Sequence, residues 1–141
     1  MHLSELHLCA HRNQIPVLLY PMPQCGSMSI QTEGRCCIGM DKGVCDCGTQ
    51  ERTHLAHELG HCLTGSFYNI HTRHDVRRRH EVRADKWAIH ALIPADQLDE
   101  AIASGCTEMW ELAEYFSVTE DFMRKAVCYH VHGNLATELY F

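Results

Sequence analysis

The spacing of apolar residues along the chain predicts a helix, then a few short strands, then several helices. Near the start, apolar residues recur every three to four positions, which predicts a short helix from Leu3 that ends near Asn13. The apolar run "IPVLLY" at 15–20 predicts a buried strand that is closed by a turn at 21–23. Further strands are expected at 27–31 and 36–40, with a turn at 41–43 after the second of them.

From Thr49 the apolar period lengthens to about 3.6 residues, which is the period of an α-helix. Thr49 is a suitable N-cap, and Glu51 lies in the first turn, where the helix dipole favours an acid. We expect this helix to run over 49–63 and to stop at Gly65, because glycine tolerates the left-handed conformation of a helix end.

The rest of the chain predicts more helices. A second long helix is expected over 80–92, and Pro94 ends it because proline disfavours helical geometry in the residue before it. Three short helices should fill 95–132, with breaks at 104–105 and 117–118 and with Thr119 as the cap of the last. The predicted fold class is therefore α+β, with a small, mostly antiparallel sheet packed on the 49–63 helix and an all-helical C-terminal part.

Length and composition fit a single domain. The chain has 141 residues, of which 45% are hydrophobic and 21% are charged, as is ordinary for a globular protein. We divide it into an N-terminal helix and small sheet (1–48), two central helices (49–93) and a C-terminal helical bundle (94–132). No stretch is apolar for long enough to span a bilayer, and the N-terminus lacks the apolar run of a signal peptide, so a cytoplasmic location is expected.

The charge of the chain argues against nucleic acid as a partner. The formal net charge is −6, and the one basic cluster, within 73–83, is interpreted as a solvated turn. The segment 110–127 has the rhythm of a helix-turn-helix, but its last helix would begin with Glu120 and Asp121, which repel phosphate. We therefore interpret the segment as a packed bundle. Its core residues would be Leu112, Phe116, Val118, Phe122 and Ala126.

Nine cysteines are a high number for a cytoplasmic protein, and four of them crowd into "RCCIGMDKGVCDCG" at 35–48. A structural zinc ribbon would use C-x₂-C pairs, and the chain contains none. We therefore predict that Cys36, Cys37, Cys45 and Cys47 are reduced thiols in a small hairpin.

The polar face of the 49–63 helix carries the candidate chemistry, in the motif H-E-x-x-H. His57 and His61 are four residues apart, so they can direct ring nitrogens to one point about 2 Å from each, as a zinc ion requires. Glu58 is placed beside them to take a proton from a metal-bound water. His54 shares this face but is not expected to be a ligand, and the apolar residues lie on a separate face that can pack on a core.

A catalytic zinc needs a third protein ligand. The metzincin pattern would place a histidine where the chain has Phe67. The segment "HEVRADKWAIHALIP" instead offers Glu81, which shares a helical face with Ala84, Asp85 and Ala88. The small residues let this helix lie close to the first, and Asp85 can then accept a hydrogen bond from a ligand imidazole. The alternative, in which both acids face solvent and pair with Lys or Arg, is outweighed by the motif on the first helix.

Three segments resemble the ImmA/IrrE family of small intracellular zinc metallopeptidases, which are of the gluzincin type. They are "LAHELGHCLTGSFYN" at 55–69, "HEVRADKWAIHALIPADQL" at 80–98 and "WELAEYFSVTEDFMRKAV" at 110–127. The resemblance implies a zincin-like fold, one zinc ion (Zn²⁺) held by His57, His61 and Glu81, and Glu58 as the general base. The first third of the chain is similar only in its outline of a helix followed by strands.

The same resemblance implies the activity and the partner. It indicates a zinc-dependent endopeptidase that cleaves a specific protein, such as a helix-turn-helix transcriptional repressor, on a mobile element or in a stress response. The alternative is a non-catalytic protein that keeps the zinc fold and sequesters its repressor. The residue that stabilises the oxyanion stays open among Tyr68, His71, His74 and His80.

So small a chain has little material for a deep substrate groove, and we expect selectivity to come from docking. Tyr115, Phe116 and the acidic surface around Glu111 and Glu114 are available to meet a basic DNA-binding protein. Such docking should weaken as the salt concentration rises.

Overall fold

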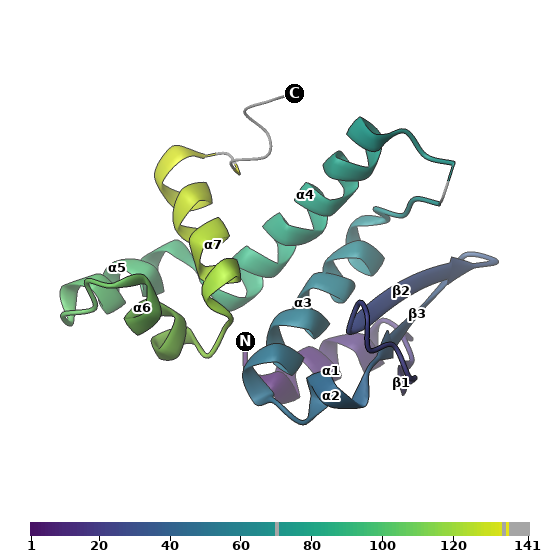
Figure 1. The fold of residues 1–141 in the computed structure, drawn as a ribbon, viewed down its shortest axis with the longest axis horizontal. Coiled ribbons are helices and arrows are strands. Elements are labelled where there is room, and N and C mark those ends of the chain that lie inside the picture. The colour runs from purple at the N-terminus through teal and green to yellow at the C-terminus, as the bar shows by residue number, and fades with distance from the viewer. Residues whose placement is uncertain (70, 134, 136–141) are drawn as a thin grey trace.

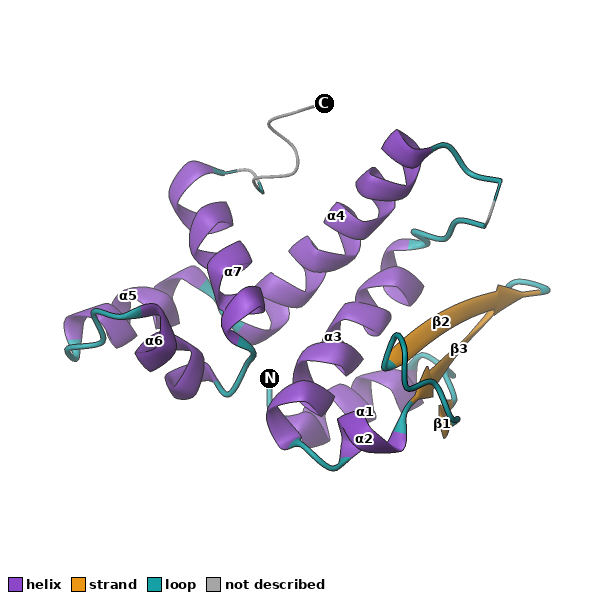
Figure 2. Ribbon diagram, in the orientation of Figure 1, coloured by secondary structure: helices purple, strands orange, loops and turns teal. Residues whose placement is uncertain are grey.

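The computed structural model describes residues 1–69, 71–133 and 135, and it has the predicted α+β architecture. Its elements are α1 (Leu3–Arg12), β1 (Val17–Leu19), β2 (Ser27–Thr32), β3 (Arg35–Met40), α2 (Lys42–Cys45), α3 (Gly48–Thr64), α4 (His74–Leu92), α5 (Ala95–Ala103), α6 (Met109–Phe116) and α7 (Glu120–His132). The long helices α3 and α4 run side by side in opposite directions through the middle of the molecule (Figure 1). The sheet, α1 and α2 lie on the α3 side, and the helices α5 to α7 lie at the other end (Figure 2).

The sheet is mixed, whereas a mostly antiparallel sheet was predicted. Its strand order is β1-β3-β2, with β1 parallel and β2 antiparallel to the central strand. A parallel pair requires a crossover connection, and here the chain forms all of β2 before β3 returns beside β1. Ile38 and Met40 of the central strand are buried in the core, which fixes the sheet on α3.

The first strand is not the buried strand that its apolar sequence predicts. β1 lies at an edge of the sheet, and Leu18 and Leu19 are exposed. A short apolar run does not reveal whether another layer will cover it, so the sequence alone could not decide this point. The predicted turn at 41–43 also differs, because Asp41 begins the short helix α2 by accepting a hydrogen bond from the N–H of Gly43.

Both long helices begin earlier than predicted. Cys47 is the N-cap of α3, so Thr49 lies in the first turn and its predicted role as the cap is wrong. α4 begins at His74. The prediction placed its start later, because the first turns are mostly polar and show no apolar period. The predicted ends are confirmed. Gly65 ends α3 in the left-handed conformation, and α4 ends shortly before Pro94.

The two long helices cross in close contact at small residues, as the sequence predicts. A methyl group in place of a hydrogen on Gly60 would lie 2.4 Å from the carbonyl oxygen of Ala84. On its apolar face, α3 buries Leu55 and Leu59 completely. This crossing sets the distance between the polar faces of α3 and α4.

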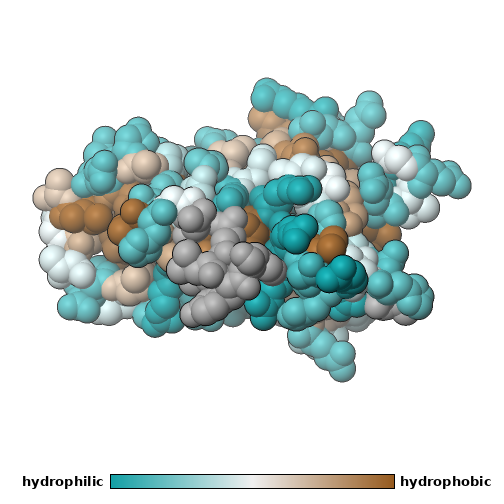
Figure 3. All heavy atoms as spheres, turned by 90° about the horizontal axis from the view of Figure 1, so that it is seen from above, coloured by the Kyte–Doolittle hydropathy of each residue, from teal (hydrophilic) through white to brown (hydrophobic). Residues whose placement is uncertain are grey.

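The three C-terminal helices have the predicted breaks and the predicted core. Thr119 caps α7 by accepting a hydrogen bond from the N–H of Phe122. All five predicted core residues are buried, namely Leu112, Phe116, Val118, Phe122 and Ala126. The face in Figure 3 is mainly hydrophilic, with hydrophobic atoms at the end formed by α5 and α6 and in further groups elsewhere on this face. Among the residues described, no helix is long and apolar enough to cross a bilayer.

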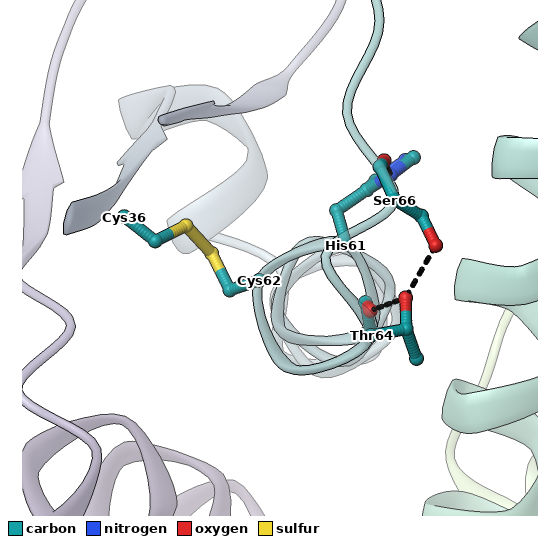
Figure 4. The surroundings of a disulfide bond; sticks show 6 residues. Cys36, His61, Cys62, Thr64 and Ser66 are labelled. Carbon is teal, nitrogen blue, oxygen red and sulfur yellow. Dashed lines mark hydrogen bonds between the residues drawn. A yellow bond between two sulfur atoms is a disulfide. The ribbon is translucent and has the colours of Figure 1, made fainter. Parts of the chain in front are cut away.

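Two cysteines form a disulfide, in contrast to the reduced thiols predicted for the cluster at 35–48. Cys36 of β3 is bonded to Cys62 of α3, and their Cα atoms are 5.8 Å apart. The prediction failed for Cys36 because its partner lies outside the cluster, on the face of α3 that packs on the sheet. The other three cysteines of the cluster are free. Figure 4 looks along α3 and shows the disulfide on one side of the helix and His61 on another.

Candidate metal centre

Three side chains from the two long helices converge on one point. Nε2 of His57 lies 2.9 Å from one carboxylate oxygen of Glu81, and Nε2 of His61 lies 3.3 Å from the other. The two imidazole nitrogens are 3.1 Å apart. Ligands at about 2.0–2.1 Å from one tetrahedral zinc ion are about 3.3 Å from one another. The spacing of these donors therefore fits a single ion, and among the described residues they form the candidate metal-binding group.

An acceptor holds the other ring nitrogen of each imidazole. Nδ1 of His57 is 2.8 Å from a carboxylate oxygen of Asp85, which is the contact that the sequence predicts. Nδ1 of His61 is 2.5 Å from the backbone carbonyl oxygen of Ser66. Each Nδ1 must carry a proton to donate to these acceptors, so a neutral ring directs the lone pair of its Nε2 atom at the point near Glu81. With both rings neutral, the two Nε2 atoms and the Glu81 carboxylate are three donors that could hold one cation between them.

The second carboxylate oxygen of Asp85 is also engaged. Nζ of Lys125, on α7, lies 3.2 Å from it. Burial would raise the pKa of Asp85, but the hydrogen bond from His57 and the charge of Lys125 lower it below its usual range. A charged Asp85 is thus held between the ligand helix and the C-terminal bundle.

The electrostatics of the site favour a positive charge between the two acids. Burial alone would lower the pKa of His57, but hydrogen bonds to Asp85 and Glu81 outweigh it and raise the pKa to about 10. Burial would raise the pKa of Glu81, but hydrogen bonds from His57, His61 and Tyr68 hold it well below its usual range. The two acids therefore stabilise a positive charge at the position of His57.

Glu58 lies next to the converging donors but belongs to a different set of contacts. Its side chain is buried, and its Oε2 accepts a hydrogen bond of 2.6 Å from the hydroxyl of Ser27. The same Ser27 oxygen lies 2.7 Å from Nδ1 of His54. His54 is thus beside the site and outside the group of converging donors, as the sequence predicts.

A cavity of about 600 Å³ lies over these residues. It is lined by Cys25, residues 27–31 of β2, His54, His57, Glu58 and His61 of α3, residues 66–68, and Glu81 of α4. The candidate ligands and Glu58 therefore face a space that is large enough to admit part of a peptide.

Of the four candidate oxyanion donors, Tyr68 lies in this cavity. Its hydroxyl donates a hydrogen bond of 2.6 Å to Glu81. Burial and this hydrogen bond raise the pKa of Tyr68 to about 12, which keeps the hydroxyl protonated. His80 stacks on the Tyr68 ring, whereas His71 and His74 are not part of the cavity lining among the described residues.

Sequence reasoning missed three residues that complete the site, namely Ser27, Ser66 and Lys125. Ser27 and Lys125 lie 31 and 40 residues from the carboxylates that they contact, so no local spacing connects them. The contact of Ser66 with His61 could have been predicted from the sequence. Gly65 turns the chain back at the end of α3, and this turn brings the next carbonyl group to His61.

An H-E-x-x-H helix with a third donor from a following helix defines a candidate metallopeptidase site. Comparison with protein families agrees, because residues 47–127 match the IrrE N-terminal-like domain, Peptidase_M78. The chain belongs to this family, which confirms the ImmA/IrrE assignment made from the sequence. The match begins just before α3 and ends within α7, so it includes both long helices. No curated protein and no solved structure matches the chain.

Proposed function

We propose that the chain is a zinc-dependent endopeptidase with His57, His61 and Glu81 as metal ligands and Glu58 as the general base. The observation that carries this proposal is the carboxylate of Glu58, placed beside three converging donors at a cavity. A structural zinc has four protein ligands and needs no neighbouring base, whereas a catalytic zinc has three and keeps one position open. Membership of a peptidase family supports the same function.

Each group of the site has a distinct role in peptide hydrolysis. Zinc bound here would acidify a water molecule and polarise the scissile carbonyl group. Glu58 is placed to accept a proton from a water molecule in the cavity and to pass it to the leaving amine. Asp85 and the carbonyl group of Ser66 keep the two imidazoles in the tautomer that presents Nε2. Tyr68, a protonated donor at the cavity, is the best placed of the four candidates to stabilise the oxyanion.

The strand β2 offers a place for the substrate backbone. It is an edge strand, and its residues 27–31 line the cavity beside the metal ligands. An extended peptide can add to such an edge through main-chain hydrogen bonds. Met28 and Ile30 are partly exposed on this strand, so they are available to contact apolar side chains of the peptide.

The substrate that we propose is a helix-turn-helix transcriptional repressor encoded beside this chain, on a mobile element or in a stress response. This part rests on what the family resemblance implies, together with a partly exposed aromatic residue in an acidic surface. Tyr115 is 51% exposed, and Glu111 and Glu114 are close to it in the sequence. Phe116 was predicted to share in docking, but it is 6% exposed and packs in the bundle, so we exclude it. The second candidate function is a non-catalytic protein that binds and sequesters the repressor.

The test compares the zinc-loaded chain with its Glu58→Gln variant, using the neighbouring repressor and casein as substrates. Both proteins should hold about one zinc per chain by elemental analysis, because the three ligands are unchanged. Only the wild type should cut the repressor, at a bond located by mass spectrometry. The variant should be about 10²- to 10⁴-fold slower, because an amide cannot accept the proton.

Each other result has a distinct meaning. Equal cleavage by the two proteins would refute the role of Glu58. Efficient cleavage of casein with an intact repressor would refute the specificity. If both proteins bind the repressor and neither cuts it, the sequestering function is correct.

A further inference from the structure

We propose that Ser27 and His54 are positioning residues that hold the Glu58 carboxylate through a chain of hydrogen bonds from the sheet to α3. The inference rests on the proposed peptidase function and adds to it two residues outside the metal-binding motif. The Ser27 hydroxyl lies 2.6 Å from Oε2 of Glu58 and 2.7 Å from Nδ1 of His54. Both Ser27 and Glu58 are buried, so water does not readily replace these contacts.

The chemistry of the three groups fixes the direction of this chain. An ionised carboxylate can only accept, so Ser27 must donate its single proton to Glu58. Ser27 can then only accept from His54, which requires a proton on Nδ1 of that imidazole. Burial lowers the pKa of His54, so the ring is neutral at pH 7 and Nε2 carries no proton.

The backbone before Ser27 is shaped to fit the His54 ring. Gly26 has φ of +80°, a conformation that side-chain-bearing residues rarely adopt. A methyl group at Gly26 would lie 2.9 Å from Cε1 of His54 and 2.8 Å from Val44. The Gly26 carbonyl oxygen accepts a hydrogen bond from the N–H of Asp41, which ties this turn to the end of β3. Gly26 therefore lets β2 begin against the imidazole, with the hydroxyl of Ser27 between its two partners.

The consequence for catalysis follows from the flexibility of a glutamate side chain. Ser27 holds one oxygen of Glu58, which leaves the other free to exchange protons in the cavity. The metal ligands lie on α3 and α4, whereas Ser27 lies on β2, so the loss of its hydroxyl should not change metal binding. We expect kcat to fall about 10- to 100-fold, because a catalytic group displaced by about 1 Å can cost about 10²-fold in rate, with KM within about twofold.

The experiment compares four zinc-loaded full-length proteins: wild type, Ser27→Ala, Ser27→Thr and His54→Asn. The threonine keeps the hydroxyl, and the asparagine amide can donate from the place of Nδ1. Initial rates are measured on whichever protein the wild type cleaves, the neighbouring repressor or casein, together with zinc content. The tautomer of His54 is read from ¹⁵N NMR spectra, with His54→Asn identifying its signals.

The inference is supported if all four proteins have a normal zinc content and Ser27→Ala has a lower kcat than the wild type. Ser27→Thr and His54→Asn should have a kcat close to that of the wild type. The His54 spectrum should show the Nδ1–H tautomer in the wild type and its loss in Ser27→Ala. The inference is overturned if Ser27→Ala keeps the wild-type kcat, if it loses its zinc, or if wild-type His54 carries its proton on Nε2. A wild type that cleaves neither protein refutes the peptidase proposal itself, and the inference with it.

Discussion

Replacing Gly60 by alanine should push apart the two helices that carry the metal ligands. The new methyl group would lie 2.4, 2.9 and 3.0 Å from the backbone oxygen, Cα and carbonyl carbon of Ala84. These atoms belong to the regular backbone of α4 and cannot rotate away, so reaching an ordinary contact of 3.4 Å requires a shift of about 1 Å (3.4 − 2.4). Ala84 lies about one helical turn from Glu81, so the shift moves the Glu81 carboxylate away from the two imidazoles.

Two opposing effects set the expected change in the free energy of unfolding. Alanine is better than glycine in a helix interior by about 1 kcal/mol, whereas overpacking a tight contact costs about 1–3 kcal/mol. Because the contact is with backbone, we use the upper part of that range and expect a net loss of about 1–2 kcal/mol in the free energy of unfolding. Zinc sites tolerate ligand displacements of only about 0.2 Å, so zinc affinity should fall at least about tenfold.

Urea unfolding of the metal-free protein and zinc competition against a chelator measure the two effects separately. The matched control is Gly48→Ala in the first turn of the same helix, where a methyl group would have nothing within 4 Å. This control should be neutral or slightly stabilising, and it should bind zinc like the wild type. The reasoning about the helix crossing would be refuted if Gly60→Ala matched the control in both stability and zinc affinity.

Four further predictions concern the site and the disulfide. Glu81→Ala should lose most of the bound zinc in elemental analysis, and a normal zinc content would contradict its assignment as a ligand. The pKa of His57, about 10, predicts that zinc affinity rises about tenfold per pH unit from pH 7 to 9, because binding releases this proton. In the metal-free protein, the stabilisation from protonated His57 should be complete below about pH 6.5 and lost as pH rises through about 10, which unfolding curves at several pH values will check. Reduction of the disulfide between Cys36 and Cys62, which are 26 residues apart, should lower the free energy of unfolding by about 3–4 kcal/mol, and a Cys36→Ser, Cys62→Ser double variant should be unaffected by reductant.

The local part of the site could be predicted from the sequence, because helical geometry converts spacing into position. His57 and His61 are one turn apart, and the face that carries Glu81 also carries small residues that allow close packing. The non-local part could not be predicted. Ser27 reaches Glu58 only because the sheet packs on α3, and Lys125 reaches Asp85 only because α7 folds back on α4.

In the fold, too, local features could be predicted from the sequence and non-local ones could not. The breaks between α5, α6 and α7 were predicted because turn and capping residues such as Thr119 act locally. The exposure of Leu18 and the parallel pairing of β1 were not predicted, because both depend on which elements pack beside the strand. The disulfide belongs to this second class, since Cys62 meets Cys36 only through the packing of α3 on the sheet.

The pairing of His57 with two acids affects how the protein acquires its metal. Small zinc domains whose ligands are held by the ion alone unfold when the ion is removed. Asp85 and Glu81 both contact the His57 imidazole and raise its pKa, so we expect a proton on His57 to take the place of the ion between the two acids. We therefore expect the folded protein to bind and release its metal in exchange for a proton. The protein could be emptied by a chelator and refilled without passing through an unfolded chain, which is exposed to proteases and aggregation.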